Sequence, residues 1–303
     1  MMRAHRMPIT LTQLTLVAPW LIAAISVVSG CAPKDAQVQD VVRPVVADDV
    51  TTSQPATTVH AAAPGAMRET RQSVDPQGLL DQSFQAAEGV ETSRMAFHRQ
   101  ERLGLFKSLQ PAERMIALCR ERPFSVLFTW LDDDSEFSQC VFIEGANDGA
   151  VLLHRRKGLF GGEGGVVAFP PELGVVFQKA KLPITDFGLR RVMAALRARI
   201  EAADTWGGAQ KVYVGRVIVG PANELCDHLT LRFPDEDAHA AKRVELYLHA
   251  ATHLPVMIEL WLPDRGGDPT SALDARYIFA ESEINPALTD TDFRLDAEKA
   301  NNN

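Results

Sequence analysis

The feature that most constrains the fold is a run of short alternating segments between Arg114 and His154. In Phe124–Leu131, for example, Val126, Phe128 and Trp130 alternate with smaller or polar residues, as in a strand with one buried face. Turn residues rich in Asp, Asn and Gly separate this segment from its neighbours. The pattern predicts an antiparallel meander with strands at Met115–Arg122, Phe124–Leu131, Cys140–Glu144 and Ala150–His154.

Further strands are predicted on both sides of this meander. The same criteria give one earlier strand and five later ones, at Thr92–Leu103, Val212–Val219, Leu225–Phe233, Val244–His249, Pro255–Leu262 and Ala275–Glu283. Antiparallel strands interrupted by one long helix predict an α+β domain built on a strongly curved sheet.

Two amphipathic helices are expected to cover this sheet. Asp75 and Pro76 are typical of a helix start, and Gly89 of a helix end. The second helix, 186–204, begins at a cap formed by Thr185 or Asp186 and carries an apolar stripe at helical spacing, whereas its arginines lie mostly off that stripe. The stripe consists of Leu189, Val192, Met193, Leu196 and Ile200.

The N-terminal segment has the pattern of a secreted lipoprotein. Arg3 and Arg6 precede an apolar run, and residues 1–30 are expected to form a signal peptide. Val28-Ser29-Gly30-Cys31 resembles the bacterial lipobox, in which the cysteine is diacylated and becomes the mature N-terminus. The resemblance implies lipidation of Cys31, and Ala32 after it favours the periplasmic face of the outer membrane over the inner membrane.

Composition sets the remaining boundaries. Residues 31–74 combine the lipidated Cys with a proline-rich segment that lacks aromatic residues, which predicts a flexible linker. The folded domain is expected at 75–296 and a disordered tail at 297–303.

The chain has a formal net charge of −8, which argues against nucleic-acid binding. Cys119, Cys140 and Cys226 are expected to be buried free thiols, because Cys119 and Cys140 would lie two strands apart.

Several motifs together resemble a known bacterial family. They are Gln100-Glu101-Arg102, Arg122-Pro123-Phe124-Ser125-Val126, Trp130, Glu144-Gly145-Ala146-Asn147-Asp148-Gly149, His154, Leu182-Pro183-Ile184 with Gly188-Leu189, Thr252-His253-Leu254-Pro255 and the closing segment from Asn285 to Phe293. In this order they resemble the domain of unknown function 1571 family. The closing pattern is also similar to that of LolA- and LolB-type lipoprotein carriers. The resemblance implies a half-open barrel with helices packed on its concave side; the Gly158–Gly165 loop has no counterpart.

Residues that suggest catalysis or metal binding have simpler interpretations. His249 and His253 flank a turn rather than share a helix face, and Asp132–Glu136 lacks the ligand spacing of a calcium loop. Glu144 and His154 could form an acid–base pair across strands, although a structural hydrogen bond is the more ordinary outcome. The sequence therefore predicts no catalytic residue, no metal and no cofactor.

The leading functional hypothesis is a binding module whose apolar cavity, between sheet and helices, holds an acyl chain, a lipoprotein ligand or another amphiphile. The alternative is a structural or scaffolding envelope lipoprotein with a filled core that acts through its surface. An envelope hydrolase is a weaker third hypothesis. The candidate cavity residues are Phe97, Val126, Phe128, Trp130, Phe142, Leu189, Val192, Met193, Leu196, Leu246, Ile258 and Leu260.

The lipid anchor can be tested directly. Replacing the thiol in Cys31→Ala removes the acceptor for diacylglycerol, so metabolic labelling with an alkyne fatty acid should mark the wild-type protein and leave the variant unmarked. Equal labelling of both proteins would show that Cys31 is not the lipidation site.

Overall fold

The computed structural model describes residues 42–44, 74–157, 164–176, 179–234, 241–263 and 272–296. The predicted signal peptide, Cys31, most of the predicted linker, Gly158–Glu163 of the glycine-rich loop and the predicted tail lie outside these residues. Within the linker range, Val42–Pro44 is described as strand β1, which pairs antiparallel with the end of β9.

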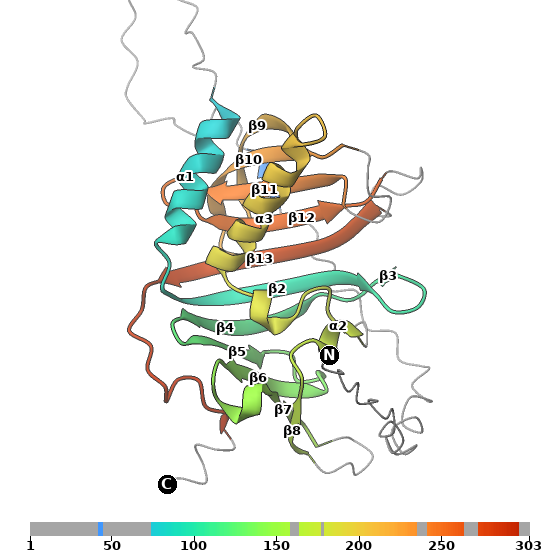
Figure 1. Ribbon diagram of the computed structural model, residues 1–303, viewed down its shortest axis with the longest axis vertical. Coiled ribbons are helices and arrows are strands. Elements are labelled where there is room, and N and C mark those ends of the chain that lie inside the picture. Colours follow the sequence, from blue (N-terminus) through green and yellow to red (C-terminus); the bar gives the residue numbers. More distant parts are fainter. Residues whose placement is uncertain are drawn as a thin grey trace, which may run out of the picture. The chain divides into compact units, whose positions relative to one another are not determined.

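One open antiparallel sheet of 13 strands forms the scaffold (Figure 1). Its spatial order is β1-β9-β10-β11-β12-β13-β2-β4-β5-β6-β7-β8, and the short β3 pairs with β2. Among the described residues β1 and β8 do not pair, so the sheet stays open. The expected half-open, strongly curved sheet with helices on its concave face is confirmed.

The sheet consists of two meanders joined at one seam. The first comprises β2 (Thr92–Leu103), β3 (Ser108–Leu109), β4 (Glu113–Glu121), β5 (Phe124–Trp130), β6 (Phe137–Ile143), β7 (Val151–Arg155) and β8 (Gly165–Phe169). The second comprises β9 (Gln210–Val219), β10 (Glu224–Arg232), β11 (Arg243–His249), β12 (Pro255–Trp261) and β13 (Leu273–Ile284). β13 pairs with β2, so the last strand of the chain lies beside the first strand of the domain.

The predicted strands are all present, but the prediction missed several elements. β8, β3 and β1 were not predicted, nor was the four-residue helix α2 (Leu173–Val176). β8 was missed because flanking glycines and prolines hide a five-residue apolar run. β6 begins at Phe137, three residues earlier than predicted, because an irregularity between Phe137 and Gln139 interrupts its alternation.

Helix α1 (Pro76–Glu88) begins as the sequence predicts. The Asp75 carboxylate accepts hydrogen bonds from the backbone N–H groups of Gln77 and Gly78 at 3.0 Å each, and Gly89 is the C-cap. The buried side of the helix carries Leu79, Leu80, Phe84 and Ala87, which join the main core. Helix formation and burial therefore follow from one local pattern.

Helix α3 (Leu189–Asp204) is the crossover between the two meanders. The prediction that Thr185 or Asp186 caps it is wrong, because both residues belong to a preceding 3₁₀ turn, Ile184–Asp186, and the N-cap is Gly188. Gly188 has φ 115°, and a Cβ at this position would lie 2.9 Å from the Cys119 Sγ. Only glycine allows the helix to start this close to β4.

The predicted α3 stripe packs into the core. Leu189, Met193, Leu196 and Ile200 are buried, and Val192 packs against the same cluster. In Figure 1, α1 and α3 lie together over β9–β13. Three free thiols, those of Cys119, Cys140 and Cys226, are buried, as predicted, and burial raises the pKa of each to about 12.

The C-terminal segment covers part of the opposite, convex face. Phe293 and Leu295 pack with Leu127 and Val141 of β5 and β6. The Arg120 guanidinium lies 4.9 Å from the centre of the Phe293 ring and also pairs with Asp290 at 2.7 Å. Residues after β13 therefore form an apolar contact on the convex face.

Because the α3 stripe is buried, substitutions at neighbouring positions of this helix should differ strongly in their effect on the free energy of unfolding. Leu196→Asp should lower the free energy of unfolding by roughly 3 kcal/mol or more, because it places an unpaired charge in the core. The matched control Ala195→Asp is on the exposed side of the same turn and should cost less than roughly 1 kcal/mol. Denaturant unfolding of both variants measures the difference; equal midpoints would contradict the packing of this helix.

Candidate functional site

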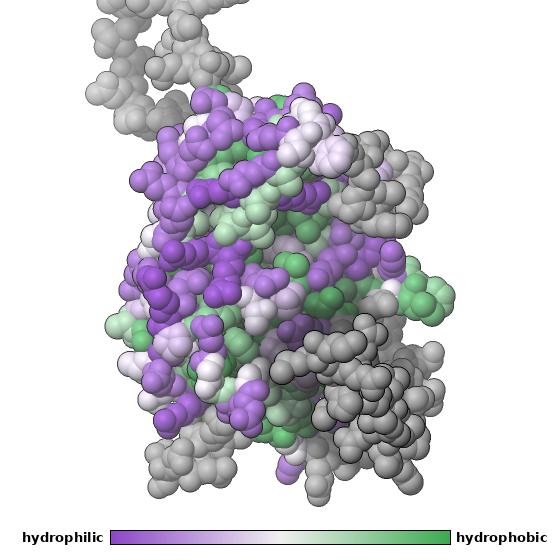
Figure 2. Space-filling view, in the orientation of Figure 1, coloured by the Kyte–Doolittle hydropathy of each residue, from purple (hydrophilic) through white to green (hydrophobic). Residues whose placement is uncertain are grey.

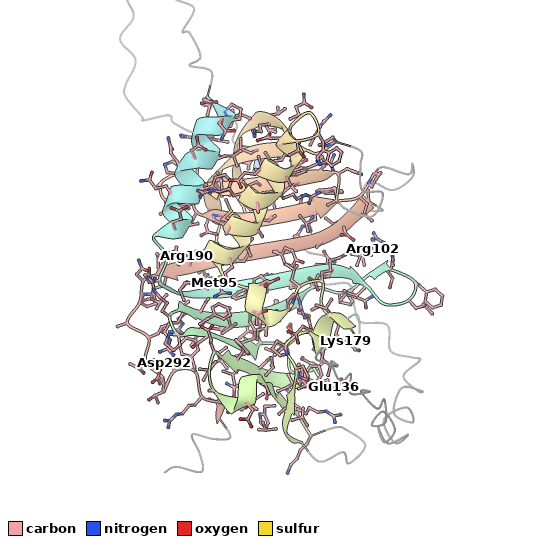
Figure 3. The ribbon with its side chains drawn as sticks, in the orientation of Figure 1. Met95, Arg102, Glu136, Lys179, Arg190 and Asp292 are labelled. Atoms are coloured by element: carbon pink, nitrogen blue, oxygen red, sulfur yellow. The ribbon has the colours of Figure 1, made fainter. Side chains whose placement is uncertain are left out.

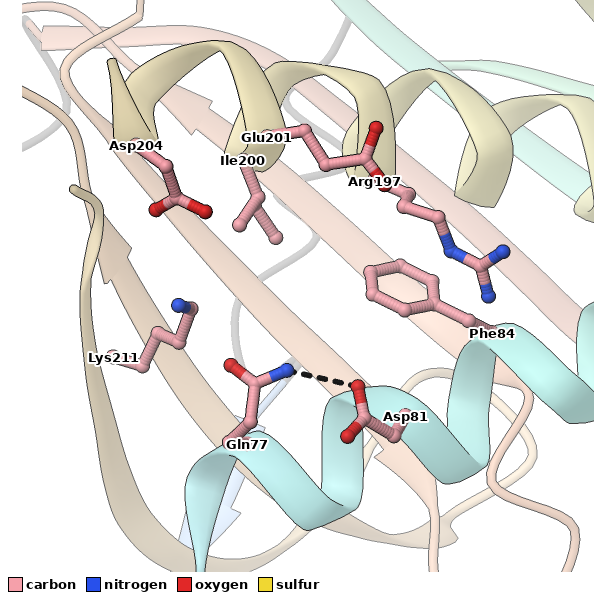
Figure 4. Close-up of a pocket in the computed structure, with 8 residues that line it drawn as sticks. All are labelled: Gln77, Asp81, Phe84, Arg197, Ile200, Glu201, Asp204 and Lys211. Atoms are coloured by element: carbon pink, nitrogen blue, oxygen red, sulfur yellow. Dashed lines mark hydrogen bonds between the residues drawn. The ribbon is translucent and has the colours of Figure 1, made fainter. Parts of the chain in front are cut away.

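A groove of about 400 Å³ lies between α1 and α3 (Figure 4). Its lining residues come from α1, α3 and the start of β9: Gln77, Asp81, Phe84, Arg197, Ile200, Glu201, Asp204 and Lys211. Phe84 and Ile200 are buried and supply its apolar surface, whereas the other lining side chains are polar or charged. The groove is therefore amphipathic, and its volume lies within the usual range for ligand pockets, roughly 300–1,000 Å³.

Helical periodicity explains why these residues meet. Gln77, Asp81 and Phe84 follow one another at spacings of four and three, so they share one side of α1. Arg197, Ile200 and Asp204 have the complementary spacings on α3. Two such rows face each other because both helices lie on the same half of the sheet (Figure 1).

The polar wall of the groove is partly fixed by internal bonds. The Gln77 side-chain amide donates to Asp81 at 2.8 Å. Arg197 pairs with Glu88 at 2.6 Å, and its guanidinium carbon lies 4.6 Å from the centre of the Phe84 ring. Arg197 thus bridges the two helices and covers one end of the apolar surface. Although the sequence places Arg197 off the apolar stripe, its side chain packs on this surface and joins both helices.

The charges of the groove carry both signs. Asp81, Glu201 and Asp204 contribute three carboxylates, and Arg197 and Lys211 contribute two cations. A slightly acidic, mixed rim over an apolar surface suits a ligand that has an apolar part and a zwitterionic or cationic head.

The structure places all twelve predicted cavity residues on one face of the sheet, in or against a single core. Nine are buried members: Phe97, Val126, Trp130, Phe142, Leu189, Met193, Leu196, Leu246 and Ile258. Phe128, Val192 and Leu260 are partly buried against the same cluster. None of the twelve lines the groove between α1 and α3. The sequence named these residues as cavity candidates, but the face that each strand presents and the position of the groove both depend on the tertiary structure.

A second polar feature lies on the concave face, where β2, β4 and β13 run side by side. The buried Glu101 accepts a hydrogen bond from the Tyr277 hydroxyl at 2.6 Å. Arg99 pairs with Glu113, and the Trp130 indole N–H donates to the same carboxylate at 3.2 Å. This cluster was not predicted from the sequence. Its signal is the pair of charged residues at alternate positions, Arg99 and Glu101, on the otherwise apolar face of β2.

The pKa values of this cluster follow from burial and charge. Burial raises the pKa of Tyr277 well above its ordinary value, and the negative charge of Glu101 adds to the effect. Burial opposes the charge on Arg99, but the carboxylates of Glu113 and Glu101 outweigh it and raise its pKa. At neutral pH the cluster is therefore a neutral phenol beside ion-paired groups, which is a structural arrangement and lacks an activated nucleophile.

The other candidate chemical groups are not brought together. Glu144 accepts a hydrogen bond from the Phe124 backbone N–H at 3.2 Å, whereas the His154 Nδ1 lies 2.8 Å from the Ser138 hydroxyl. The alternative of a Glu144–His154 acid–base pair is therefore wrong. The His249 Nδ1 accepts from backbone N–H groups of its own turn. Within the described ranges no cluster of three or more His, Cys, Asp or Glu side chains could hold a metal ion.

Comparison with protein families shows which family the chain belongs to. The model of a family described as "Protein of unknown function (DUF1571)" matches residues 90–302. The chain belongs to the DUF1571 family. This agrees with the resemblance drawn from its motifs. No curated protein matches the sequence of this DUF1571 member. None of the helices in the described ranges is long and apolar enough to cross a membrane.

Three solved structures illustrate the wider similarity in shape. A crystal structure of MucB is 15% identical, with a TM-score of 0.44, and the match covers 74% of this chain and 64% of that one. The structure of the Pseudomonas aeruginosa MucA/MucB complex is 15% identical, with a TM-score of 0.41, and the match covers 74% of this chain and 62% of that one. The Mycobacterium tuberculosis lipoprotein LppX is 12% identical, with a TM-score of 0.40, and the match covers 71% of this chain and 100% of that one. The DUF1571 chain therefore spans less than two thirds of the MucB chains it matches.

The buried hydrogen bond of Tyr277 gives a test of the concave-face cluster. Tyr277→Phe should lower the free energy of unfolding by about 1–3 kcal/mol, because it removes the hydroxyl donor to the buried Glu101. The matched control is Tyr213→Phe: the Tyr213 hydroxyl donates to Asp227 at 2.9 Å, but this hydrogen bond is only partly buried, whereas that of Tyr277 is buried. Denaturant unfolding should show a smaller loss for the control, and equal losses would contradict a special role for the Glu101 site.

Proposed function

We propose that this DUF1571 protein is a lipid-anchored envelope lipoprotein that binds an amphiphile in the groove between α1 and α3. The observation that carries the proposal is the combination of the apolar Phe84–Ile200 surface with a rim of both charges. The apolar part would take an acyl chain, and the rim would take the head group. The role is one of binding rather than catalysis.

The binding energy would come from both parts of the groove. Each methylene group buried against Phe84 and Ile200 contributes about 0.8 kcal/mol, and the polar rim contributes the rest. The polar rim would then select among head groups, with Arg197 and Lys211 available to an anionic group and Asp81, Glu201 and Asp204 available to a cationic one.

Anchoring is the second part of the proposal. The lipobox at Val28–Cys31 supports diacylation of Cys31, and Ala32 supports the periplasmic face of the outer membrane. The anchor would keep the groove near a membrane, where amphiphiles are concentrated.

The alternative is a scaffold with a filled core, and one observation favours it. All twelve residues expected to line a cavity pack in or against one core cluster, so the concave face uses much of its apolar surface internally. On this reading the groove holds only water, and the protein acts through its surface.

Ligand binding distinguishes the two functions. A chain from residue 32 onward should bind a fluorescent fatty acid saturably, and dodecylphosphocholine should displace it. Gln77→Trp fills the groove from the exposed side of α1 and should weaken binding at least tenfold, equivalent to about 1.4 kcal/mol. Gln82→Trp is the matched control, since Gln82 is exposed on the same helix but does not line the groove.

Two outcomes would contradict amphiphile binding in this groove. One is the absence of saturable binding, which favours the scaffold. The other is equal weakening by Gln77→Trp and Gln82→Trp, which would place the ligand elsewhere. Circular dichroism of both variants checks that the fold is retained.

A further inference from the structure

The loop between β2 and β3 exposes two large apolar side chains. Leu105 is 86% exposed and Phe106 is 90% exposed, the highest values among the large hydrophobic residues that the structure describes. Figure 2 shows a hydrophobic projection where Figure 1 draws this loop, at the right edge of the molecule. Exposure of two adjacent bulky residues at one projecting point is unusual for a surface in contact only with water.

The loop is held in one conformation by its own hydrogen bonds. Gly104 has φ 75°, and the Lys107 N–H donates to the Gly104 carbonyl at 3.0 Å. The Arg102 guanidinium donates to the carbonyls of Lys107 and Leu273 at 3.0 Å each, which joins the loop to the start of β13. Leu105 and Phe106 are therefore presented by a fixed turn that extends from the sheet.

The loop reaches past the sheet. β13 begins at Leu273, and β2 ends at Leu103, which pairs with Ser108 of β3, so Leu105 follows two residues after the end of β2. At the rise of an extended strand, this corresponds to a projection of up to roughly 7 Å. Interfacial elements bury their apolar side about 5–10 Å into a bilayer surface, so the loop is long enough to reach that depth before the sheet edge meets the head groups.

The loop segment itself carries cations and no carboxylates, although the chain as a whole is acidic. Residues 102–112 contain Arg102 and Lys107 and no Asp or Glu, whereas the chain has a net charge of −8. The segment after α2 lies against the base of the loop, because the Lys181 N–H approaches the Glu101 carboxylate and its Nζ pairs with Asp274 at 2.7 Å. This segment adds the exposed Lys179 (labelled in Figure 3) and Leu182, which is 48% exposed.

We propose that the β2–β3 tip is a membrane-contacting element that inserts Leu105 and Phe106 into an anionic lipid surface. The apolar pair would enter the boundary between head groups and acyl chains, and Lys107 would remain among the anionic head groups. The acidic remainder of the protein would be repelled by the same surface. Contact through this tip would thus fix which end of the domain faces the membrane, independently of any ligand in the α1–α3 groove.

Fluorescence quenching in the full chain tests the proposal. The full chain carrying Phe106→Trp is reconstituted into vesicles of phosphatidylcholine and phosphatidylglycerol, with either ordinary or brominated acyl chains. The wild-type signal is subtracted to isolate the new tryptophan. Bromine at interfacial depth should reduce the signal of this introduced tryptophan by about half. The matched control is Val214→Trp, at another exposed apolar position (55%) on β9, and its signal should not change.

Two further variants separate the apolar and charged contributions. Adding Leu105→Asp to Phe106→Trp should abolish the quenching, because a carboxylate then occupies the apolar tip. Adding Lys107→Glu should reduce quenching on vesicles that contain phosphatidylglycerol and leave it unchanged on phosphatidylcholine alone. Circular dichroism checks that each variant is folded, and fatty-acid binding in the α1–α3 groove should be the same in all of them.

Three results would overturn the proposal. Equal signals of the Phe106→Trp variant in ordinary and brominated vesicles would show that the tip does not enter the lipid. Equal quenching of the tryptophans introduced at positions 106 and 214 would show that the protein contacts the vesicle but does not face it with the β2–β3 tip. An emission of the Phe106→Trp variant that shifts to the blue with protein concentration, without quenching by bromine, would assign the tip to a contact between copies of the chain.

Discussion

The structure depends on the aromatic cluster around Phe97, at the seam between the two meanders. The Phe97 ring lies 5.4 Å from Phe279 of β13, 6.0 Å from Phe128 of β5 and 4.9 Å from Phe187, just before α3. Each such pair adds roughly 0.5–1.5 kcal/mol beyond the burial of its area. One residue of β2 therefore holds together both meanders and the start of the crossover helix.

The position of the groove follows from this seam. Because β13 pairs with β2, the chain must cross from β8 at one edge of the sheet to β9, which lies next to the edge strand β1 on the other side, and α3 is part of that crossing. Phe187 fixes where the crossing begins, and Gly188 allows it to start against β4. α1 then occupies the same half of the concave face, and the two helices enclose the groove with their polar edges.

Charged side chains have different roles on the concave face of the sheet and at the surface. Charged groups on the concave face, such as Arg99, Glu101 and Glu113, are engaged with one another and with Tyr277 and Trp130, so they stabilise the fold. Most charged groups of the groove and of the β2–β3 tip reach solvent instead. Recognition of other molecules is therefore expected at the helices and at the tip rather than deep in the sheet.

The sequence by itself determined ten of the thirteen strands and the two longer helices, because these depend on periodicity and on local caps. Asp75 and Gly89 bounded α1 correctly, since capping involves only neighbouring backbone groups. The start of α3 could not be found this way: Gly188 is the cap because of a close approach to Cys119, 69 positions earlier in the chain. Only the tertiary structure decided this contact.

The site shows the same division. The sequence placed Ile200 with Leu189, Met193 and Leu196 on a stripe that packs on the sheet. It could not reveal that Ile200 also lines a groove together with Phe84. That outcome depends on the spacing between two helices, which is set by contacts such as Arg197 with Glu88 across the chain. In the sequence, Leu105 and Phe106 are only two apolar residues between strands, and nothing local shows that they are exposed. Their exposure follows from the tertiary structure, because the sheet ends before the loop does and no other element covers the tip among the residues described.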